Sequence, residues 1–322
     1  MPKVALMGQI HEDGLKILED SKFNFIEITD YAYNNLRKEL KDVSAIAIRT
    51  AELSQTILQE CKSLKIVSRH GVGYDNVDLN YLNKEKIALA ITGTANAVTV
   101  AEHVMSMFFC LCKNSKISDQ LVRIGKFNHK KSLQDTLELY QKNILIIGFG
   151  RIGQTLAKRC NSFETRVYVY DPYVESKFIK ENNCFPISFE TGIKIADFIS
   201  LHLPINEKTK YLITKKELSK MKKTCILVNT ARGGIIKEDD LVWALQNKVI
   251  HSAGLDVFEQ EPPNENDLLF KLNNLILSPH NAALTLECRQ RMAVETCSNI
   301  VNYLNRSSDL VLNNIVNKEI LN

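Results

Sequence analysis

The sequence predicts an α/β protein with two domains, each built on a sheet of parallel strands. Short apolar runs alternate with helix-compatible segments almost from end to end, which is typical of α/β folds. The runs are rich in Ile, Val and Leu at consecutive positions, as expected of parallel strands covered on both faces. A chain of 322 residues is also long enough to form two separate cores.

The first set of apolar runs occupies the N-terminal third of the chain. Five strands are predicted there, at residues 3–8, 23–29, 43–49, 64–69 and 87–92. Helix-compatible polar segments separate most of them. A buried helix is expected next, because residues 104–112 form the apolar run VMSMFFCLC.

The second set of runs predicts six more strands. They lie at residues 142–150, 166–171, 196–203, 224–230, 251–257 and 275–280. An amphipathic helix is predicted at residues 286–305, near the end of the chain.

Composition excludes several classes of partner. The net charge of +4 is small, so we expect no nucleic-acid partner and no anionic membrane surface. The N-terminal segment lacks the apolar core of a signal peptide, and no apolar run is long enough to span a bilayer, which predicts a cytoplasmic location. The eight cysteines include no Cys-x-x-Cys pair, so we expect reduced thiols and no metal site.

Residues 148–153, GFGRIG, match the G-x-G-x-x-G pattern, which is weak evidence by itself. Its context strengthens it: a strand precedes the turn, a helix and a second strand follow, and Asp171 ends that second strand. Gly148 would permit the tight turn, Gly150 the approach of a pyrophosphate, and Gly153 close helix–strand packing. We interpret the segment as a dinucleotide-binding turn.

The same segment indicates which dinucleotide binds. The helix that starts at Arg151 and Ile152 would offer main-chain amides and the positive end of its dipole to the phosphates. The carboxylate of Asp171 could accept hydrogen bonds from the ribose hydroxyls but would repel a 2′-phosphate. This favours NAD over NADP as the cofactor.

Three later strands end in residues that could carry chemistry. Arg232 could bind a carboxylate through two hydrogen bonds, and His280 could transfer a proton near neutral pH. Glu261 could fix the imidazole tautomer and favour its charged form. Each of these residues, taken alone, also has a purely structural explanation. Arg232 could be a surface arginine in a turn, His280 a capping or satisfied histidine, and Glu261 a solvated acid. Glu259 is the competing candidate for the partner of His280.

The succession of GFGRIG, YDPY, LHLP, NTARGG, GLDVFEQEP and SPHNAA resembles the D-isomer-specific 2-hydroxyacid dehydrogenases. The resemblance extends through SRHGVGYDNVD and TANAVTVAEHV, and so covers nearly the whole chain. Within the family, 3-phosphoglycerate dehydrogenases and hydroxypyruvate reductases look most similar. Formate dehydrogenases of the same superfamily have glutamine at the place of Glu261, so the glutamate favours 2-hydroxyacid chemistry.

The resemblance implies a fold and an assembly. A Rossmann-type NAD-binding domain, residues 100–287, would be inserted into a flavodoxin-like substrate-binding (catalytic) domain, residues 1–99 and 288–322. The substrate cleft would lie between the two domains. The helices after the first boundary would build the interface of a homodimer.

The resemblance also implies roles for individual residues. Arg232, Glu261 and His280 would form the catalytic set, and Asp256 would lie near the nicotinamide. Further cofactor-binding positions would be Val72, Leu203, Pro204, Thr230, Ala231 and Ala282. The substrate-binding positions would be Arg49, Val72, Gly73, Asn96, Arg232 and His280.

The function implied is an NAD-dependent oxidoreductase that interconverts a small D-2-hydroxy acid and its 2-oxo acid. 3-Phosphoglycerate dehydrogenase, which belongs to serine biosynthesis, and hydroxypyruvate reductase are the favoured activities. Arg49 would then bind a phosphate, although it could equally be a surface charge at a strand end. The alternatives are a reductase of glyoxylate or another 2-oxo acid, and an NAD(H)-sensing, corepressor-like binding protein.

Overall fold

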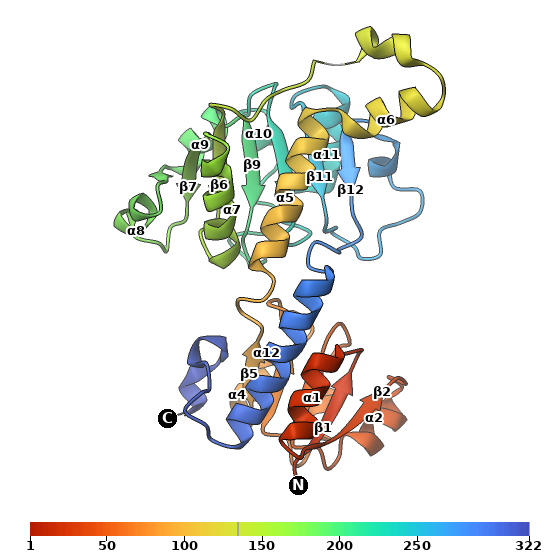
Figure 1. Ribbon diagram of the computed structural model, residues 1–322, viewed down its shortest axis with the longest axis vertical. Coiled ribbons are helices and arrows are strands. Elements are labelled where there is room, and N and C mark those ends of the chain that lie inside the picture. The colour runs from red at the N-terminus through yellow and green to blue at the C-terminus, as the bar shows by residue number, and fades with distance from the viewer. Residues whose placement is uncertain (134, 322) are drawn as a thin grey trace. The chain divides into compact units, whose positions relative to one another are not determined.

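The computed structural model describes residues 1–133 and 135–321, apart from the side chains of residues 131 and 132. The chain divides into two compact units, each with its own sheet (Figure 1). Unit 1 consists of residues 1–96 and 283–322, and unit 2 of residues 97–282. No helix in the described part of the chain is both long and apolar enough to cross a membrane.

Unit 1 contains a five-stranded parallel sheet with the strand order β2-β1-β3-β4-β5. The strands are β1 (Lys3–Met7), β2 (Asn24–Ile28), β3 (Ala45–Ile48), β4 (Ile66–Arg69) and β5 (Ala88–Ile91). The helices are α1 (Glu12–Asp20), α2 (Tyr33–Glu39), α3 (Gln55–Leu58), α4 (Leu79–Lys84) and α12 (Leu286–Leu304), with 3₁₀ turns η3 (Leu312–Asn314) and η4 (Lys318–Leu321). This strand order is that of flavodoxin-like folds.

Both faces of the unit 1 sheet are covered, which explains why its strands are apolar at successive positions. In β1, Val4 packs with α1 and α12 on one face, whereas Ala5 belongs to the core beneath α2, α3 and α4 on the other. The C-terminal segment also joins the sheet. Asn317 accepts a hydrogen bond from the amide of Leu89 (2.8 Å) and donates one to the carbonyl oxygen of Ile87 (2.9 Å). Unit 1 is therefore built from both ends of the chain.

Unit 2 contains a seven-stranded parallel sheet with the order β12-β11-β10-β9-β6-β7-β8. Its strands are β6 (Asn143–Ile147), β7 (Arg166–Tyr170), β8 (Phe185–Pro186), β9 (Phe198–Leu201), β10 (Ile226–Asn229), β11 (Ser252–Leu255) and β12 (Leu275–Leu277). The order from β8 to β11 is that of the Rossmann fold, with β12 as an added edge strand. The sequence did not predict β8, a two-residue strand that contains a proline and lies at the sheet edge.

Helices cover both faces of the second sheet as well. Those of unit 2 are α5 (Ala97–Cys112), α6 (Ser115–Arg123), α7 (Arg151–Ser162), α8 (Ser176–Glu181), α9 (Phe189–Ile195), α10 (Lys215–Leu218) and α11 (Glu238–Gln246), with 3₁₀ turns η1 (Phe127–Ser132) and η2 (Leu268–Lys271). Helices α5 and α7 pack on one face (Figure 1), and α9, α10 and α11 on the other. The predicted fold class, a Rossmann-type unit inserted into a flavodoxin-like one, is confirmed.

Candidate active site

The glycine turn after β6 is shaped by two close main-chain approaches. Gly148 has φ +96°, and a Cβ atom there would lie 2.3 Å from the carbonyl oxygen of His202. A Cβ atom at Gly153 would lie 2.2 Å from the carbonyl oxygen of Gly148. Any larger residue at either position would displace the main chain, so glycine at 148 permits the close approach to the segment after β9, and glycine at 153 permits the packing of α7 against the turn.

The turn leaves space where a phosphate would bind. Gly150 is the N-cap of α7, where no side chain caps the helix, and a Cβ atom at this residue would have no neighbour within 4 Å. The amides at the start of a helix lack intrahelical acceptors and carry the positive end of the helix dipole. Arg151 and Ile152 belong to this first turn. The arrangement fits the pyrophosphate of a dinucleotide.

Asp171 directly follows β7 and is bonded to the glycine turn. One carboxylate oxygen accepts a hydrogen bond from the amide of Phe149 (2.8 Å), and the other accepts one from the amide of Tyr173 (2.9 Å). The carboxylate is therefore held beside the turn that would bind phosphate. A carboxylate oxygen has more than one lone pair, so each oxygen of Asp171 can still accept a hydrogen bond from a ribose hydroxyl group.

The other predicted cofactor positions of unit 2 follow three neighbouring strands. Leu203 and Pro204 come after β9, Thr230 and Ala231 after β10, and Asp256 after β11. Because adjacent parallel strands end at the same edge of a sheet, these residues share the carboxyl edge of the unit 2 sheet. The hydroxyl group of Thr230 is buried there without a hydrogen-bond partner among the described residues.

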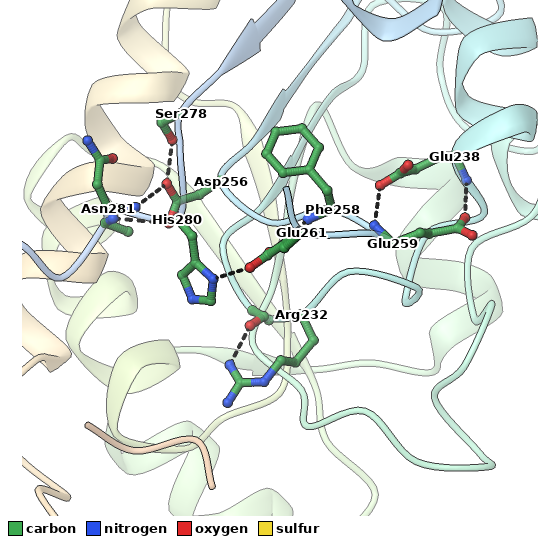
Figure 2. Close-up of polar contacts among 11 residues, drawn as sticks. Arg232, Glu238, Asp256, Phe258, Glu259, Glu261, Ser278, His280 and Asn281 are labelled. Carbon is green, nitrogen blue, oxygen red and sulfur yellow. Dashed lines mark hydrogen bonds and ion pairs between the residues drawn. The ribbon is translucent and has the colours of Figure 1, made fainter. Parts of the chain in front are cut away.

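The loop that carries Arg232 is fixed by the last residue of β10. The side chain of Asn229 accepts a hydrogen bond from the amide of Ala231 (3.0 Å) and donates one to the carbonyl oxygen of Arg232 (2.8 Å). The guanidinium group of Arg232 donates to the carbonyl oxygen of Ala231 (2.7 Å). Figure 2 shows this group directed to the same side as the imidazole of His280.

Glu261 and His280 form a direct pair (Figure 2). Nδ1 of His280 lies 2.7 Å from Oε2 of Glu261, and Oε1 of Glu261 accepts a hydrogen bond from the amide of Phe258 (3.1 Å). The other acid of the loop, Glu259, contacts different groups. The pairing through Nδ1 leaves Nε2 as the ring nitrogen for a substrate. Both side chains are partly exposed, at 53% for His280 and 37% for Glu261.

Asp256 holds the turn that carries His280. Its buried carboxylate accepts hydrogen bonds from the hydroxyl group of Ser278 (2.5 Å) and from the amides of Asn281 (2.9 Å) and Ala282 (3.0 Å). His280 lies within this turn at φ +50°, a conformation that is unfavourable for a residue with a Cβ atom. The three hydrogen bonds stabilise the turn in that conformation.

The predicted substrate-binding residues of unit 1 share the carboxyl edge of the other sheet. Arg49 follows β3, Val72 and Gly73 follow β4, and Asn96 follows β5, and these three strands are adjacent. Arg49 donates a hydrogen bond to the carbonyl oxygen of Gln9 (3.3 Å). The side-chain oxygen of Asn96 is buried without a partner among the described residues.

Two basic residues at this edge were not predicted from the sequence. Arg69 ends β4 and donates a hydrogen bond to the carbonyl oxygen of His70 (2.5 Å). Burial, assisted by the charges of Arg49 and Arg69, lowers the pKa of His70 to about 4, so His70 is neutral at pH 7. The available signal was their position directly after an apolar strand, immediately before the glycines of RHGVGYD.

His103 of α5 was also missed. Its Nε2 lies 3.0 Å from the hydroxyl oxygen of Ser278 and 3.8 Å from the carboxylate of Asp256. The contact links a helix on one face of the sheet to the turn of His280. A histidine within an apolar helix gives no sequence signal of such a contact, because its partners are more than 150 residues away in the chain.

Comparison with known proteins identifies the family. Residues 105–282, more than half of the chain, match the NAD-binding domain of the D-isomer-specific 2-hydroxyacid dehydrogenases. The chain therefore belongs to this family and contains its NAD-binding domain, as the motifs predicted.

Named relatives differ in substrate and in length. The chain is 33% identical to a glyoxylate reductase of Thermococcus litoralis, over 99% of this chain and 98% of that protein. It is 35% identical to a hydroxypyruvate reductase of Thermotoga maritima, over 83% and 87% respectively. It is 33% identical to a D-3-phosphoglycerate dehydrogenase of Methanocaldococcus jannaschii over 90% of this chain, but spans only 55% of that longer protein.

A solved structure shows the same similarity. A D-lactate dehydrogenase from Aquifex aeolicus, in complex with NAD and lactic acid, matches 97% of this chain and 98% of its own. The TM-score is 0.85 at 28% sequence identity. Similarity of fold therefore extends along nearly the full length of both chains.

Proposed function

We propose that this protein is an NAD-dependent dehydrogenase that interconverts a small D-2-hydroxy acid and the corresponding 2-oxo acid. The observation that carries the proposal is the 2.7 Å contact between Glu261 and Nδ1 of His280. The pair lies at the same sheet edge as Arg232 and the glycine turn. One edge therefore holds a pair that could transfer a proton, a cation, and a turn that could bind the phosphates of a dinucleotide.

The roles of the three catalytic candidates follow from this geometry. Bound NADH supplies the hydride that reduces the carbonyl carbon. His280, charged, gives the proton on Nε2 to the carbonyl oxygen, and in the oxidative direction takes the hydroxyl proton back. Glu261 accepts the hydrogen bond from Nδ1 and so stabilises the imidazolium. Arg232 binds the substrate carboxylate through two parallel hydrogen bonds.

The preferred cofactor in this proposal is NAD. The amides at Arg151 and Ile152 would bind the pyrophosphate beside Gly150, and Asp171 would accept hydrogen bonds from the adenosine ribose. A 2′-phosphate in the same position would face the carboxylate of Asp171 and be repelled. Leu203, Pro204, Thr230, Ala231, Asp256 and Ala282 would complete the site in unit 2. Val72 of unit 1 is a further cofactor-binding position that the family resemblance implies.

The favoured substrates are 3-phosphoglycerate and its 2-oxo acid, followed by hydroxypyruvate. Arg49 and Arg69, two cations at one sheet edge, could bind a doubly charged distal group of the substrate. The amides at Val72 and Gly73 could bind a carboxylate. Asn96 would contribute a further polar contact. A phosphorylated substrate would assign the enzyme to serine biosynthesis.

Glyoxylate reduction is the second candidate. It is favoured by relatives of that name that match this chain over nearly their whole length, whereas the phosphoglycerate dehydrogenases are much longer. Glyoxylate has no distal group, so an enzyme for it would not need the charge of Arg49.

A homodimer is part of the same proposal. Helix α6 buries no side chain within the chain, and Val122, Ile124 and Phe127 are exposed on and after it. Apolar side chains grouped in this way are typical of surfaces that bind another protein. Light scattering after gel filtration would distinguish a dimer from a monomer. The cytoplasmic location remains a prediction from the sequence.

The substrate assay measures loss of NADH absorbance with phosphohydroxypyruvate, hydroxypyruvate and glyoxylate in parallel. A strong preference for the phosphorylated acid would support the phosphoglycerate activity, and a preference for either other acid would support a general reductase. The variant His280→Gln serves as the control for contaminating activity. NADH binding without turnover of any acid would contradict the proposal and favour the NAD(H)-sensing, corepressor-like alternative.

A further inference from the structure

We propose that Glu238 and Glu259 act together as a positioning pair, which holds Glu261 in place relative to His280 and Arg232. Neither residue belongs to the predicted catalytic set. The kinetic part of this inference rests on the proposed dehydrogenase function.

The pair is closed by two reciprocal hydrogen bonds (Figure 2). The amide of Glu238 donates to the carboxylate of Glu259 (2.7 Å), and the amide of Glu259 donates to the carboxylate of Glu238 (2.6 Å). Each side chain thus binds the main chain of the other residue. Since Glu238 is the first residue of α11, the contact fixes the loop of Glu259 to the start of a helix.

A third segment supports the pair. The hydroxyl group of Tyr211 donates a hydrogen bond to the second carboxylate oxygen of Glu259 (3.0 Å). The amide of Tyr211 donates to the carbonyl oxygen of Gly234 (2.7 Å), two residues after Arg232. Tyr211 therefore connects the loop of Glu259 to the loop of Arg232.

The two catalytic loops also touch directly. A Cβ atom at Gly233 would lie 1.7 Å from the carbonyl oxygen of Phe258, so only glycine permits this approach. The amide of Phe258 in turn donates to Glu261. The segments 232–238 and 258–261 are thus joined at two places, by Gly233 against Phe258 and by the Glu238–Glu259 pair. A displacement of Glu259 would move Glu261, which lies two residues further along.

The electrostatics of the pair argue against a role in stability alone. Burial, together with the charges of Glu259, Asp267 and Asp239, raises the pKa of Glu238 to about 7, against the lowering effect of the hydrogen bond that its carboxylate accepts from the amide of Glu259. Two neighbouring acids are a costly way to join two loops, because like charges repel. A positioning role accounts for their presence, since each carboxylate reaches an amide that an apolar side chain could not bind.

The experiment compares Glu238→Ala and Glu259→Ala with Asp239→Ala, which removes an exposed acid from the same first turn of α11. We expect kcat for the preferred 2-oxo acid to fall between about 10- and 100-fold in the first two variants, as for small misplacements of catalytic groups. KM for the acid and Kd for NADH should change by less than about twofold, because the pair binds neither. Asp239→Ala should behave like the wild type.

A conservative replacement tests why kcat falls in the alanine variants. Glu238→Gln and Glu259→Gln keep a carbonyl oxygen that can accept from the partner amide, so each should recover most of kcat. Tyr211→Phe, which removes only the supporting hydroxyl group, should give a smaller loss of the same kind. Unchanged kcat in both alanine variants, or no recovery with glutamine, would overturn the inference.

Deuterium exchange separates this inference from the proposed function. We expect the amides of residues 258–261 to exchange faster in the alanine variants and to regain protection in the glutamine variants. If the wild type reduced none of the three acids, the proposed function would fail, and exchange would still decide whether the pair orders the loop. Unaltered exchange in Glu238→Ala and Glu259→Ala would refute the pair whatever the activity.

Discussion

At the carboxyl edge of the unit 2 sheet, acids are bonded to donors of the same unit. Asp256 accepts three hydrogen bonds and Glu261 pairs with His280. At the corresponding edge of unit 1, the strand ends carry Arg49 and Arg69 beside the neutral His70. The same parallel architecture thus presents a hydrogen-bonded histidine–glutamate pair in one unit and two arginines at the strand ends of the other. The residue type after each strand, and not the sheet, decides which chemistry the edge supports.

The largest effect is expected from removal of the proposed proton-transfer group of unit 2, the imidazole of His280. His280→Gln should reduce kcat by about 10²- to 10⁴-fold, the usual contribution of general acid–base catalysis. Kd for NADH, measured by fluorescence titration, should stay close to the wild-type value because the glycine turn is untouched. Turnover within threefold of the wild type would show that the unit 2 edge does not transfer the proton through this residue.

A smaller and selective effect is expected from the cationic edge of unit 1. Arg49→Ala should lower kcat/KM for phosphohydroxypyruvate by about 10- to 100-fold, the value of one charge-assisted hydrogen bond. The loss for hydroxypyruvate should be severalfold less, because that acid has no phosphate. Arg49→Lys, which keeps the charge but not the planar fork, is the matched variant and should lie between. Equal losses with both acids would mean that Arg49 does not bind the phosphate.

The smallest effects concern pH, and here the two units should respond in opposite directions. The pKa of His70 is lowered to about 4 in the folded chain, so the stability it contributes is present above its ordinary pKa of 6.5 and is lost as pH falls towards 4. The pKa of Glu238 is raised to about 7, so its contribution is present below 4.5 and is lost as pH rises through 7.

Deuterium exchange at several pH values would measure this contrast. After correction for intrinsic exchange, residues 66–73 should lose about 1 kcal/mol of local stability between pH 7 and about pH 5.5. Residues 236–261 should lose protection in the opposite direction, between about pH 5 and pH 8. His70→Asn and Glu238→Gln should each flatten the dependence in their own unit only. Parallel trends in both segments would contradict the assigned pKa shifts.

The fold could be predicted because its main signals are local. Strands such as β6 and β10 are apolar at consecutive positions, which only burial on both faces explains, and Asp171 lies at the expected distance after the glycine turn. Glu261 and His280 follow the neighbouring strands β11 and β12, so their proximity is a consequence of the strand order. The family resemblance selected Glu261 over Glu259 as the partner of the histidine, and the structure has the carboxylate of Glu261 in contact with His280.

The supporting contacts could not be predicted, because they join distant parts of the chain through main-chain atoms. The amides that Glu238 and Glu259 bind carry no sequence signature, and Glu259 was considered only as a competitor of Glu261. Arg69 and His70 belong to the motif RHGVGYD, in which only Val72 and Gly73 were predicted to bind the substrate. His103 contacts Ser278 across the core of unit 2. Such contacts depend on how elements pack, which sequence periodicity does not determine.

The composition of unit 1 has a consequence for the order in which the newly made chain can fold. Its sheet is covered on one face by α12, and the edge strand β5 binds Asn317, so residues 283–322 are needed to complete it. During synthesis all residues of unit 2 leave the ribosome before this last segment. The unit second in sequence can therefore fold first, while the N-terminal strands have one face of their sheet uncovered until residues 283–322 have been made.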